Sequence, residues 1–235
     1  MRIMTFNIQH GRRSDGRIDT ELLATYVAGC RPDVVGLQEV DVGVARSGGV
    51  DQAATVARAG GFRMVFGPAC RQGIRGRYGN ALLARGEITD VETMPLPRRG
   101  RNERRAGLLA TVLVDGHRLS VAVTHLSVDA AEVPGQLAAV VEALAARPLP
   151  RVLIGDLNLQ AVAVAAGLTG RGLALADTTV PTFPAHAPAA RIDHVAVGGA
   201  TMRRVEVLGE PPVSDHRALV VELGWTPPAV PSRRD

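Results

Sequence analysis

The stretch AGLLATVLVDGHRLSVAVTHLS, residues 106–127, contains two apolar, strand-like runs separated by the dipeptide Asp115-Gly116. Asp-Gly between two such runs is a strong signal for a tight β-hairpin, because both residues tolerate the left-handed backbone of its turn. A hairpin pairs its strands antiparallel, so the sheet that contains this segment is not purely parallel.

Strand and helix patterns alternate on both sides of this hairpin. Strands are expected at residues 2–8, 32–40, 62–69, 79–86, 88–96 and 151–160, as a pair within 191–209, and within 213–223. Helices are expected at residues 19–30, with Asp19 as the N-cap, at 50–61, where glycines close the helix, and at 132–148. This order, together with the hairpin, predicts a mixed α/β layered sandwich.

The length and composition bound the class of protein. A chain of 235 residues fits one large α/β domain better than two small ones, and we assign residues 1–224 to this domain. The hydrophobic fraction of 46% is enough for a sizeable core and argues against a disordered or fibrous protein. Residues 225–235 form a Pro-rich, charged tail that we expect to be disordered.

Neither the cysteines nor the apolar segments indicate an exported or membrane protein. Cys30 and Cys70 form no Cys-x-x-Cys pair, and we expect two ordinary buried or half-buried thiols rather than a disulfide. The N-terminal sequence has no long apolar segment like that of a signal peptide, and no stretch approaches the ~18 apolar residues of a membrane span. We therefore expect a soluble, cytoplasmic monomer without a membrane span.

The basic residues are all of one type. The formal net charge is +4, and all 27 basic residues are arginine. A genome-wide compositional bias explains the missing lysine as well as a functional choice does, so this charge alone is a weak argument for a nucleic-acid partner. Arginine makes bidentate contacts to phosphate, so a phosphate-containing substrate is compatible with the composition.

Several expected strands begin or end with a polar side chain that an apolar core would not accommodate. These residues are Asn7, Glu39, His125, Asp156, Asn158, Asp193, Asp215 and His216. Taken singly, each is better explained as a turn-forming residue or a solvated strand end. As a set they indicate one site, because many strand ends of a layered α/β sandwich can meet at one edge.

The chemistry of this set favours a metal-dependent site. Carboxylate and amide oxygens, with no thiolate and few imidazoles, suit Mg²⁺ or Mn²⁺ rather than structural zinc. Mg²⁺ uses one or two carboxylates and leaves its other positions to water and substrate phosphate. Two histidines beside such an ion add hydrogen-bond donors for a developing phosphate charge. The combination predicts metal-assisted hydrolysis of a phosphoester.

The motifs TFN, LQE, THLS, GDLN, RIDHV and SDH occur in this order, with fitting separations, between residues 2 and 223. With these motifs the chain resembles the endonuclease/exonuclease/phosphatase superfamily, which includes DNase-I-like nucleases, abasic-site endonucleases, inositol-phosphate phosphatases and neutral sphingomyelinases. The resemblance implies a DNase-I-like four-layer α/β sandwich, in which two packed mixed β-sheets are flanked by helices. It also implies a divalent-metal-dependent phosphoesterase that hydrolyses a phosphodiester bond by attack of an activated water.

Further segments, among them NIQHGRRSDGRID, YGNALLARGEI and TFPAHAPAARIDHV, resemble a bacterial subgroup of this superfamily. The chain departs from the usual subgroup pattern at Arg104, where proline is usual, and at Ala106, where glycine is usual. Both positions lie near the expected mouth of the substrate site. The subgroup resemblance leaves the substrate open.

The resemblance assigns metal ligation to three of the polar residues. Glu39 is the principal metal carboxylate, and Asn7 and Asp215 are direct or water-mediated ligands of Mg²⁺ or Mn²⁺. Asp193 accepts a hydrogen bond from His216 and thereby fixes its tautomer.

The same resemblance leaves the general base open. His216 either helps to deprotonate the attacking water or, when protonated, stabilises the phosphate charge, and Asp156 is the competing base. Asn158 positions the water or a phosphate oxygen, and His125 donates a hydrogen bond to a phosphate oxygen.

The remaining candidates are substrate-binding residues. Arg105 pairs either with substrate or with Glu103. Tyr78, Asn80 and His10 are further pocket candidates, for which a purely structural role is an equal alternative. Strand alternation places His194 on the face opposite Asp193, which favours packing over catalysis.

Three function classes remain to be compared. Arginine-rich segments at 71–77 and 97–105 favour a nuclease or nucleotide phosphodiesterase, because phosphate neutralisation dominates nucleic-acid binding. The aromatic content of 3% leaves few platforms for stacking bases, which keeps open a phosphatase or phosphodiesterase for a small-molecule, lipid or polyol phosphoester. The third class, a non-catalytic binding module, is disfavoured because every polar residue of the motifs is present.

Overall fold

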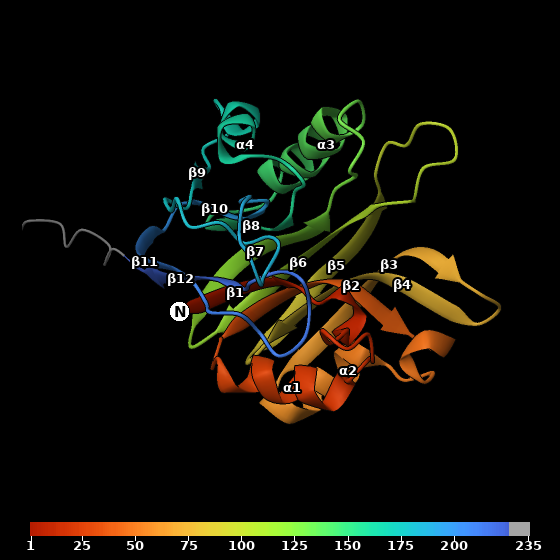
Figure 1. Ribbon diagram of the computed structural model, residues 1–235. Helices are drawn as coiled ribbons and strands as arrows, with labels where there is room; N and C mark the ends of the chain where they lie inside the picture. The colour runs from red at the N-terminus through yellow and green to blue at the C-terminus, as the bar shows by residue number, and fades with distance from the viewer. Residues whose placement is uncertain (226–235) are drawn as a thin grey trace, which may run out of the picture.

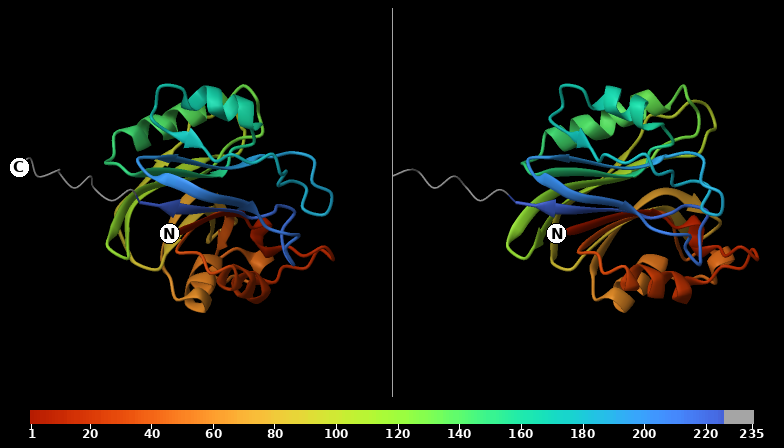
Figure 2. Two further views of the ribbon diagram at one scale, coloured as in Figure 1. Left: turned by 90° about the vertical axis from the view of Figure 1, so that its left-hand side faces the viewer. Right: turned by 60° about the vertical axis from the view of Figure 1, so that its left-hand side comes forward.

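The structure, a computed structural model, describes residues 1–225. Over this range the chain forms two six-stranded β-sheets that pack face to face, and helices cover the outer face of each sheet. Figures 1 and 2 show the four layers, with α1 and α2 on one side and α3 and α4 on the other. The predicted DNase-I-like four-layer α/β sandwich is confirmed.

The first sheet has the strand order β11-β12-β1-β2-β4-β3. Its strands are β1 (Arg2–Asn7), β2 (Val34–Val42), β3 (Arg63–Gln72), β4 (Gly76–Ala84), β11 (Thr201–Val207) and β12 (Leu219–Gly224). β1 pairs parallel with β2 and antiparallel with β12, so the sheet is mixed. The C-terminal end of β1 therefore lies between β2 and the loop that leads into β12.

The second sheet has the strand order β5-β6-β7-β8-β10-β9. Its strands are β5 (Glu87–Pro95), β6 (Ala106–Val114), β7 (His117–His125), β8 (Arg151–Asp156), β9 (Ala174–Leu175) and β10 (Asp193–Gly198). β6 and β7 form the predicted hairpin, whose turn residues Asp115 and Gly116 have φ of 49° and 76°. β7 and β8 are parallel, which makes this sheet mixed as well.

The helices are α1 (Thr20–Gly29), α2 (Gln52–Gly60), α3 (Val133–Ala145) and α4 (Ala161–Leu168), with short 3₁₀ turns at Gln9–Gly11 and Ala45–Ser47. Asp19 caps α1 as predicted, because its side chain accepts a hydrogen bond from the Leu22 amide at 2.9 Å. We did not predict α4. The preceding residue, Gln160, makes no side-chain capping bond, so the sequence signal for a helix start is missing.

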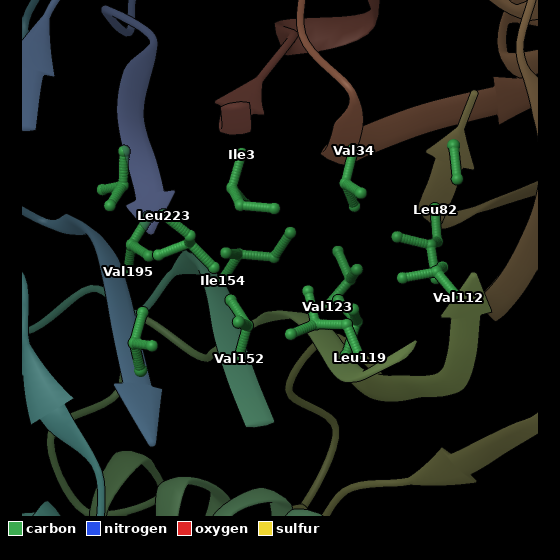
Figure 3. Packing of buried hydrophobic residues seen from close by; sticks show 14 of the residues in the cluster. Ile3, Val34, Leu82, Val112, Leu119, Val123, Val152, Ile154, Val195 and Leu223 are labelled. Carbon is green, nitrogen blue, oxygen red and sulfur yellow. The ribbon is translucent and has the colours of Figure 1, made fainter. Parts of the chain in front are cut away.

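The main hydrophobic core lies between the two sheets. Figure 3 shows Ile3, Val34 and Leu82 of the first sheet packed against residues of the second sheet that include Val123 and Ile154. Two further clusters fill the space between each sheet and its helices. Packing of these apolar side chains holds the two sheets together. The polar ends of their strands meet at one edge of the sandwich.

The remaining expectations concern the thiols and the ends of the chain. Cys30 and Cys70 are free and half-buried, as expected. The predicted Pro-rich tail, apart from Trp225, lies outside the described residues. No helix among residues 1–225 has the length and apolar content needed to cross a membrane.

Candidate active site

Strand register places three predicted residues of the second sheet in one row. His125 ends β7 and lies opposite Asp156, which ends β8, in a parallel pair. Asp193 begins β10 and lies opposite Asp156 in an antiparallel pair. All three side chains are buried, so this row forms the floor of a polar site inside the sandwich.

Asn7, at the end of β1, connects this row to the first sheet. Its Nδ2 donates to Glu39 Oε1 at 3.1 Å and to Asp156 Oδ2 at 3.0 Å. Its Oδ1 accepts from the backbone amide of Gln9 at 3.0 Å, which fixes the orientation of the amide group. Asn7 thus holds a carboxylate from each sheet, and its metal-ligand role stays a prediction.

Glu39 reaches the site through an irregularity in β2. We expected it near the end of its strand, but β2 continues to Val42, so that expectation was wrong. The register between β2 and β4 shifts between Leu37 and Val40, and Glu39 has φ of 60°. A bulge re-aims one side chain without ending the strand. The shift explains how Glu39 faces Asn7 from the interior of a strand.

His216 and Asp193 form the predicted acid–imidazole pair. His216 Nδ1 lies 2.9 Å from Asp193 Oδ2, so Nδ1–H donates to the carboxylate and Nε2 faces the site. His216 Nε2 lies 3.7 Å from Asp156 Oδ2. The ring of Phe183 packs against the imidazole with centroids 4.8 Å apart.

The loop before β12 fixes His216 through Ser214. Ser214 Oγ donates to the Asn7 carbonyl at 2.6 Å and accepts from the His216 amide at 3.1 Å. Ser214 has φ of 79°, a conformation that a serine keeps only when its surroundings impose it. Asp215 is half-buried, and its Oδ2 accepts from Gln9 Nε2 at 2.8 Å.

His125 is oriented by Arg105. Arg105 Nη1 donates to His125 Nδ1 at 2.9 Å, so the ring proton sits on Nε2, which lies 3.4 Å from Asp156 Oδ2. The same Nη1 lies 2.9 Å from Glu103 Oε1, so Arg105 makes the ion pair that we weighed as an alternative. Asp156 Oδ2 is therefore surrounded by Asn7, His125 and the more distant His216.

The other predicted residues lie around this centre. Asn158 donates its amide to Asp156 Oδ1 at 3.1 Å and its Nδ2 to the Leu126 carbonyl at 2.9 Å. His10 Nδ1 lies 3.5 Å from Glu39 Oε2. Tyr78 and Asn80 line a small cavity together with Glu39, Arg105 and His125.

Two of the candidates have structural contacts that limit their availability to a substrate. Asn80 Nδ2 donates to the Ala106 carbonyl at 2.9 Å and so ties β4 to β6. His194 is buried and its Nε2 lies 2.7 Å from the Leu159 carbonyl, in keeping with the packing role expected from alternation.

Gln9, Ser214 and Phe183 contact the site residues, and we did not predict them. Gln9 and Ser214 adjoin predicted residues inside the motifs NIQHG and SDH, so position in a motif was their only signal. Phe183 lies inside the quoted segment TFPAHAPAARIDHV, so it too had position in a motif as its only signal.

Burial and neighbouring charges shift the pKa values of Asp156, His216 and His125 in different directions. Burial and the nearby Asp193 carboxylate raise the pKa of Asp156 to about 7. Burial opposes protonation of His216, but Asp193, Asp156 and Asp215 outweigh it and raise the His216 pKa to about 9. Burial and Arg105 lower the pKa of His125, which keeps this ring neutral. Such separated pKa values are typical of acid–base sites.

The donor set fits a hard divalent cation. Glu39 and Asp156 accept hydrogen bonds from Asn7, Asp215 accepts one from Gln9, and no arginine among residues 1–225 lies within 4.0 Å of these three carboxylates. Despite burial, hydrogen bonds from His10 and Asn7 lower the pKa of Glu39 to about 2, so its carboxylate is ionised. Ligand atoms of Asp156, Asp193 and His216 also lie within 4.8 Å of one another. His216 and Asp193 already share a hydrogen bond, which favours the Glu39 side of the cluster for a cation.

The four-layer sandwich, with buried carboxylates and imidazoles at one edge of its two sheets, defines the class of phosphoester hydrolases with a DNase-I-like fold. The chain belongs to the endonuclease/exonuclease/phosphatase family, whose model matches residues 4–216. It is a phosphoesterase of this family.

Solved structures share this fold. An endonuclease/exonuclease/phosphatase from Beutenbergia cavernae is 26% identical, with a TM-score of 0.78 over 96% of this chain and 71% of that one. A mannosyl-6-phosphatase from Bacteroides thetaiotaomicron is 18% identical, with a TM-score of 0.76 over 96% and 100% of the two chains. The human nocturnin catalytic domain, solved with a bound sulfate anion, is 17% identical, with a TM-score of 0.74 over 96% and 94%. The last two show likeness of fold alone, and no match was found among curated proteins.

Proposed function

We propose that residues 1–224 form a catalytic domain that hydrolyses a phosphodiester bond with an activated water and a bound Mg²⁺ or Mn²⁺ ion. The observation that carries this proposal is the cluster of Glu39, Asp156 and Asp215 without an arginine partner among the described residues, next to the His216–Asp193 pair. Carboxylates that have no arginine partner favour a cation, and imidazoles beside them favour a phosphate.

Glu39 would hold the ion, with Asp215 and Asn7 as direct or water-mediated partners. The bound ion supplies charge stabilisation at a phosphoryl oxygen and lowers the pKa of water. The hydrogen bonds from Asn7 Nδ2 to Glu39 and Asp156 hold these two carboxylate groups apart and fix their orientation. A hydrogen bond from Gln9 Nε2 fixes the orientation of the Asp215 carboxylate.

Asp156 is the general base that the pKa directions favour. Its pKa near 7 leaves a substantial ionised fraction that accepts a proton from water at neutral pH. His216, with a pKa near 9, is protonated at this pH and donates to the phosphate through Nε2. Asp193 keeps the proton on His216 Nδ1 and so keeps Nε2 aimed at the substrate.

His125 and Asn158 complete the site. His125, neutral and protonated on Nε2 because Arg105 occupies Nδ1, donates a hydrogen bond to a phosphate oxygen. Asn158 is held by Asp156 and the Leu126 carbonyl, in a position to orient the attacking water.

A nuclease substrate is favoured by the arginine-rich segments, since cationic surfaces attract phosphate backbones. A phosphatase or phosphodiesterase for a small-molecule, lipid or polyol phosphoester is the second candidate, which the aromatic content of 3% favours. The monomeric state and the cytoplasmic location expected from the sequence stay predictions.

A metal-dependence panel tests the chemistry. Bis-p-nitrophenyl phosphate, p-nitrophenyl phosphate, plasmid DNA, RNA and lipid headgroup diesters are incubated with the protein and Mg²⁺, Mn²⁺ or EDTA. We expect hydrolysis of a diester only with metal. Cleavage of small substrates but never of polynucleotides removes the nuclease form of the proposal. Activity that persists in EDTA contradicts the mechanism.

Variants of the acid–imidazole pair test the residue roles. We expect His216→Ala and Asp193→Asn to lower kcat by about 10²–10⁴-fold, because each loses the oriented donor. His117→Ala is the matched control, because His117 lies at the opposite end of β7 from His125 and contacts no site residue described above. Undiminished activity in His216→Ala contradicts the catalytic role proposed for His216.

A further inference from the structure

A cleft of about 960 Å³ opens beside the candidate active site. One wall is formed by residues 68–77, around the tip of the β3–β4 hairpin, and the other by residues 98–104 of the loop between β5 and β6. Figure 1 shows both segments projecting from the same side of the molecule. Ala69 lines this cleft and also the small cavity that contains Glu39 and His125, so the two spaces adjoin.

The walls of this cleft carry an excess of positive charge. We call it the arginine cleft, after its lining residues Arg71, Arg75, Arg77, Arg98 and Arg104. All five are exposed, and none has a carboxylate within 4.0 Å among residues 1–225. Glu103, the one acidic residue of the described lining, is paired with Arg105 instead. The field inside the cleft therefore attracts anions.

Two of these arginines face each other across a β-ladder. Arg71 of β3 is the direct register partner of Arg77 of β4. Like charges directly opposite in an antiparallel pair are destabilising in the absence of a counter-ion. An anion between the two guanidinium groups removes this repulsion, and guanidinium groups bind phosphate through paired hydrogen bonds.

The opposite wall is anchored to α3 and to the turn that precedes it. The Arg99 amide donates to Glu132 Oε1, and Asn102 Nδ2 donates to Asp129 Oδ2 at 2.8 Å and to Glu132 Oε1 at 3.1 Å. Gln136 Nε2 donates to the Pro97 carbonyl at 2.8 Å. These bonds fix the backbone of a loop that would otherwise be free, so Arg98 and Arg104 are presented at set positions.

We propose that the arginine cleft is a second anion-binding subsite, which takes a further phosphate group of the same substrate while the scissile phosphate lies at Glu39 and His125. The inference rests on the proposed function and narrows its substrate to molecules with at least two phosphate groups. Such a group belongs either to a neighbouring nucleotide of a nucleic-acid strand or to a small bisphosphorylated molecule.

Two double variants test the subsite, Arg71→Gln/Arg77→Gln on one wall and Arg98→Gln/Arg104→Gln on the other. Arg58→Gln/Arg118→Gln is the charge-matched control, because these exposed arginines lie on α2 and β7 and do not line the cleft. Bis-p-nitrophenyl phosphate, with one phosphate, reports basal chemistry. We expect its kcat/KM to stay within about twofold in all variants.

Matched substrate pairs identify the source of the second phosphate. Thymidylyl-thymidine is compared with its 5′-phosphorylated form, and glucose 6-phosphate with glucose 1,6-bisphosphate. We expect the wild type to prefer the extra phosphate in one pair, and the cleft variants to lose about 10- to 100-fold in kcat/KM for that substrate alone. Preference within the first pair identifies a nucleic-acid strand, and preference within the second a small bisphosphate.

Calorimetric binding of tripolyphosphate to the metal-free protein is an independent readout. We expect the cleft variants to bind it at least about tenfold more weakly than the wild type and the control variant. If the wild type fails to hydrolyse bis-p-nitrophenyl phosphate, the proposed function fails, and this binding measurement still decides the subsite. Equal affinity for tripolyphosphate in the wild type and both cleft variants overturns the proposed anion-binding subsite.

Discussion

Arg105 decides which nitrogen of His125 carries the proton, because its Nη1 donates to His125 Nδ1 at 2.9 Å. We predict that Arg105→Met, which keeps the volume but removes the donor, releases the ring into a mixture of tautomers. Nitrogen-15 NMR of His125 measures this mixture directly. We expect kcat for a phosphodiester to fall by about 10- to 100-fold, since the donor to the phosphate is no longer fixed.

Glu103→Gln is the control for this prediction. It removes the exposed partner of Arg105, whose Nη1 lies 2.9 Å from Glu103 Oε1, but leaves the contact with His125. We expect a wild-type tautomer and nearly wild-type kcat. A single Nε2–H tautomer that survives in Arg105→Met contradicts the orienting role.

His194 makes the stability of the metal-free protein depend on pH. Burial lowers its pKa from 6.5 to about 4, so the folded protein binds fewer protons than the unfolded chain between these values. Its contribution to stability is fully present above about pH 6.5 and is lost as the pH falls toward 4. A shift of this size corresponds to about 3 kcal/mol.

The variant His194→Gln isolates this effect, because glutamine keeps a donor for the Leu159 carbonyl but does not titrate. We predict that the stability of the wild type relative to this variant falls by up to about 3 kcal/mol between about pH 7.5 and pH 4. Urea unfolding in EDTA across this range measures the difference. A difference that does not change with pH excludes the buried neutral histidine as its cause.

At the scale of the element, Glu132 helps to hold the loop between β5 and β6 in place. Glu132 accepts from the Arg99 amide and from Asn102 Nδ2, and it lies buried at the start of α3. We predict that Glu132→Ala loosens this loop, so that its exposed arginines fit the active site of trypsin more readily. Cleavage within residues 98–104 is expected to become about tenfold faster.

Glu142→Ala is the matched control, because Glu142 lies on the same helix but is exposed and away from the loop. We expect its cleavage rate to equal that of the wild type, as followed by mass spectrometry of the fragments. Equal rates in Glu132→Ala and the wild type rule out the anchoring role.

At the scale of the whole molecule, the close approach of the two sheets depends on Gly36 of β2. A side-chain carbon at this position would lie 2.5 Å from Ile154 Cδ1 and 3.0 Å from Val123 Cγ1, both in the second sheet. We predict that Gly36→Val destabilises the fold by about 1–3 kcal/mol, because added volume in a filled core forces neighbours out of place. Denaturant unfolding at neutral pH measures the loss.

Gly29→Ala serves as the control, because a side-chain carbon at Gly29 of α1 would have no atom within 4 Å. We expect no loss of stability there. Since Asp156 follows Ile154 by two residues on β8, we also expect Gly36→Val to lower activity by shifting that strand end. Unchanged stability in Gly36→Val contradicts the packing described here.

Much of the fold was predictable from local sequence. The Asp115-Gly116 turn, the Asp19 cap and the alternating strands depend on neighbours within a few residues, and all three predictions are confirmed. The helix α4 was missed because Gln160 gives no capping signal. Glu39 was placed at a strand end because a bulge depends on pairing with β4, which no local pattern reveals.

The sequence by itself determined the chemical inventory of the site and the order in which it occurs along the chain. Only the tertiary structure brought Asn7 of one sheet into contact with Asp156 of the other. It also placed Arg105 where it fixes the orientation of His125, and it brought two arginine-rich loops together as the walls of one cleft. The physical reason is that residue type and periodicity are local properties. Contacts between segments more than a hundred residues apart arise only when the apolar faces of the two sheets pack together.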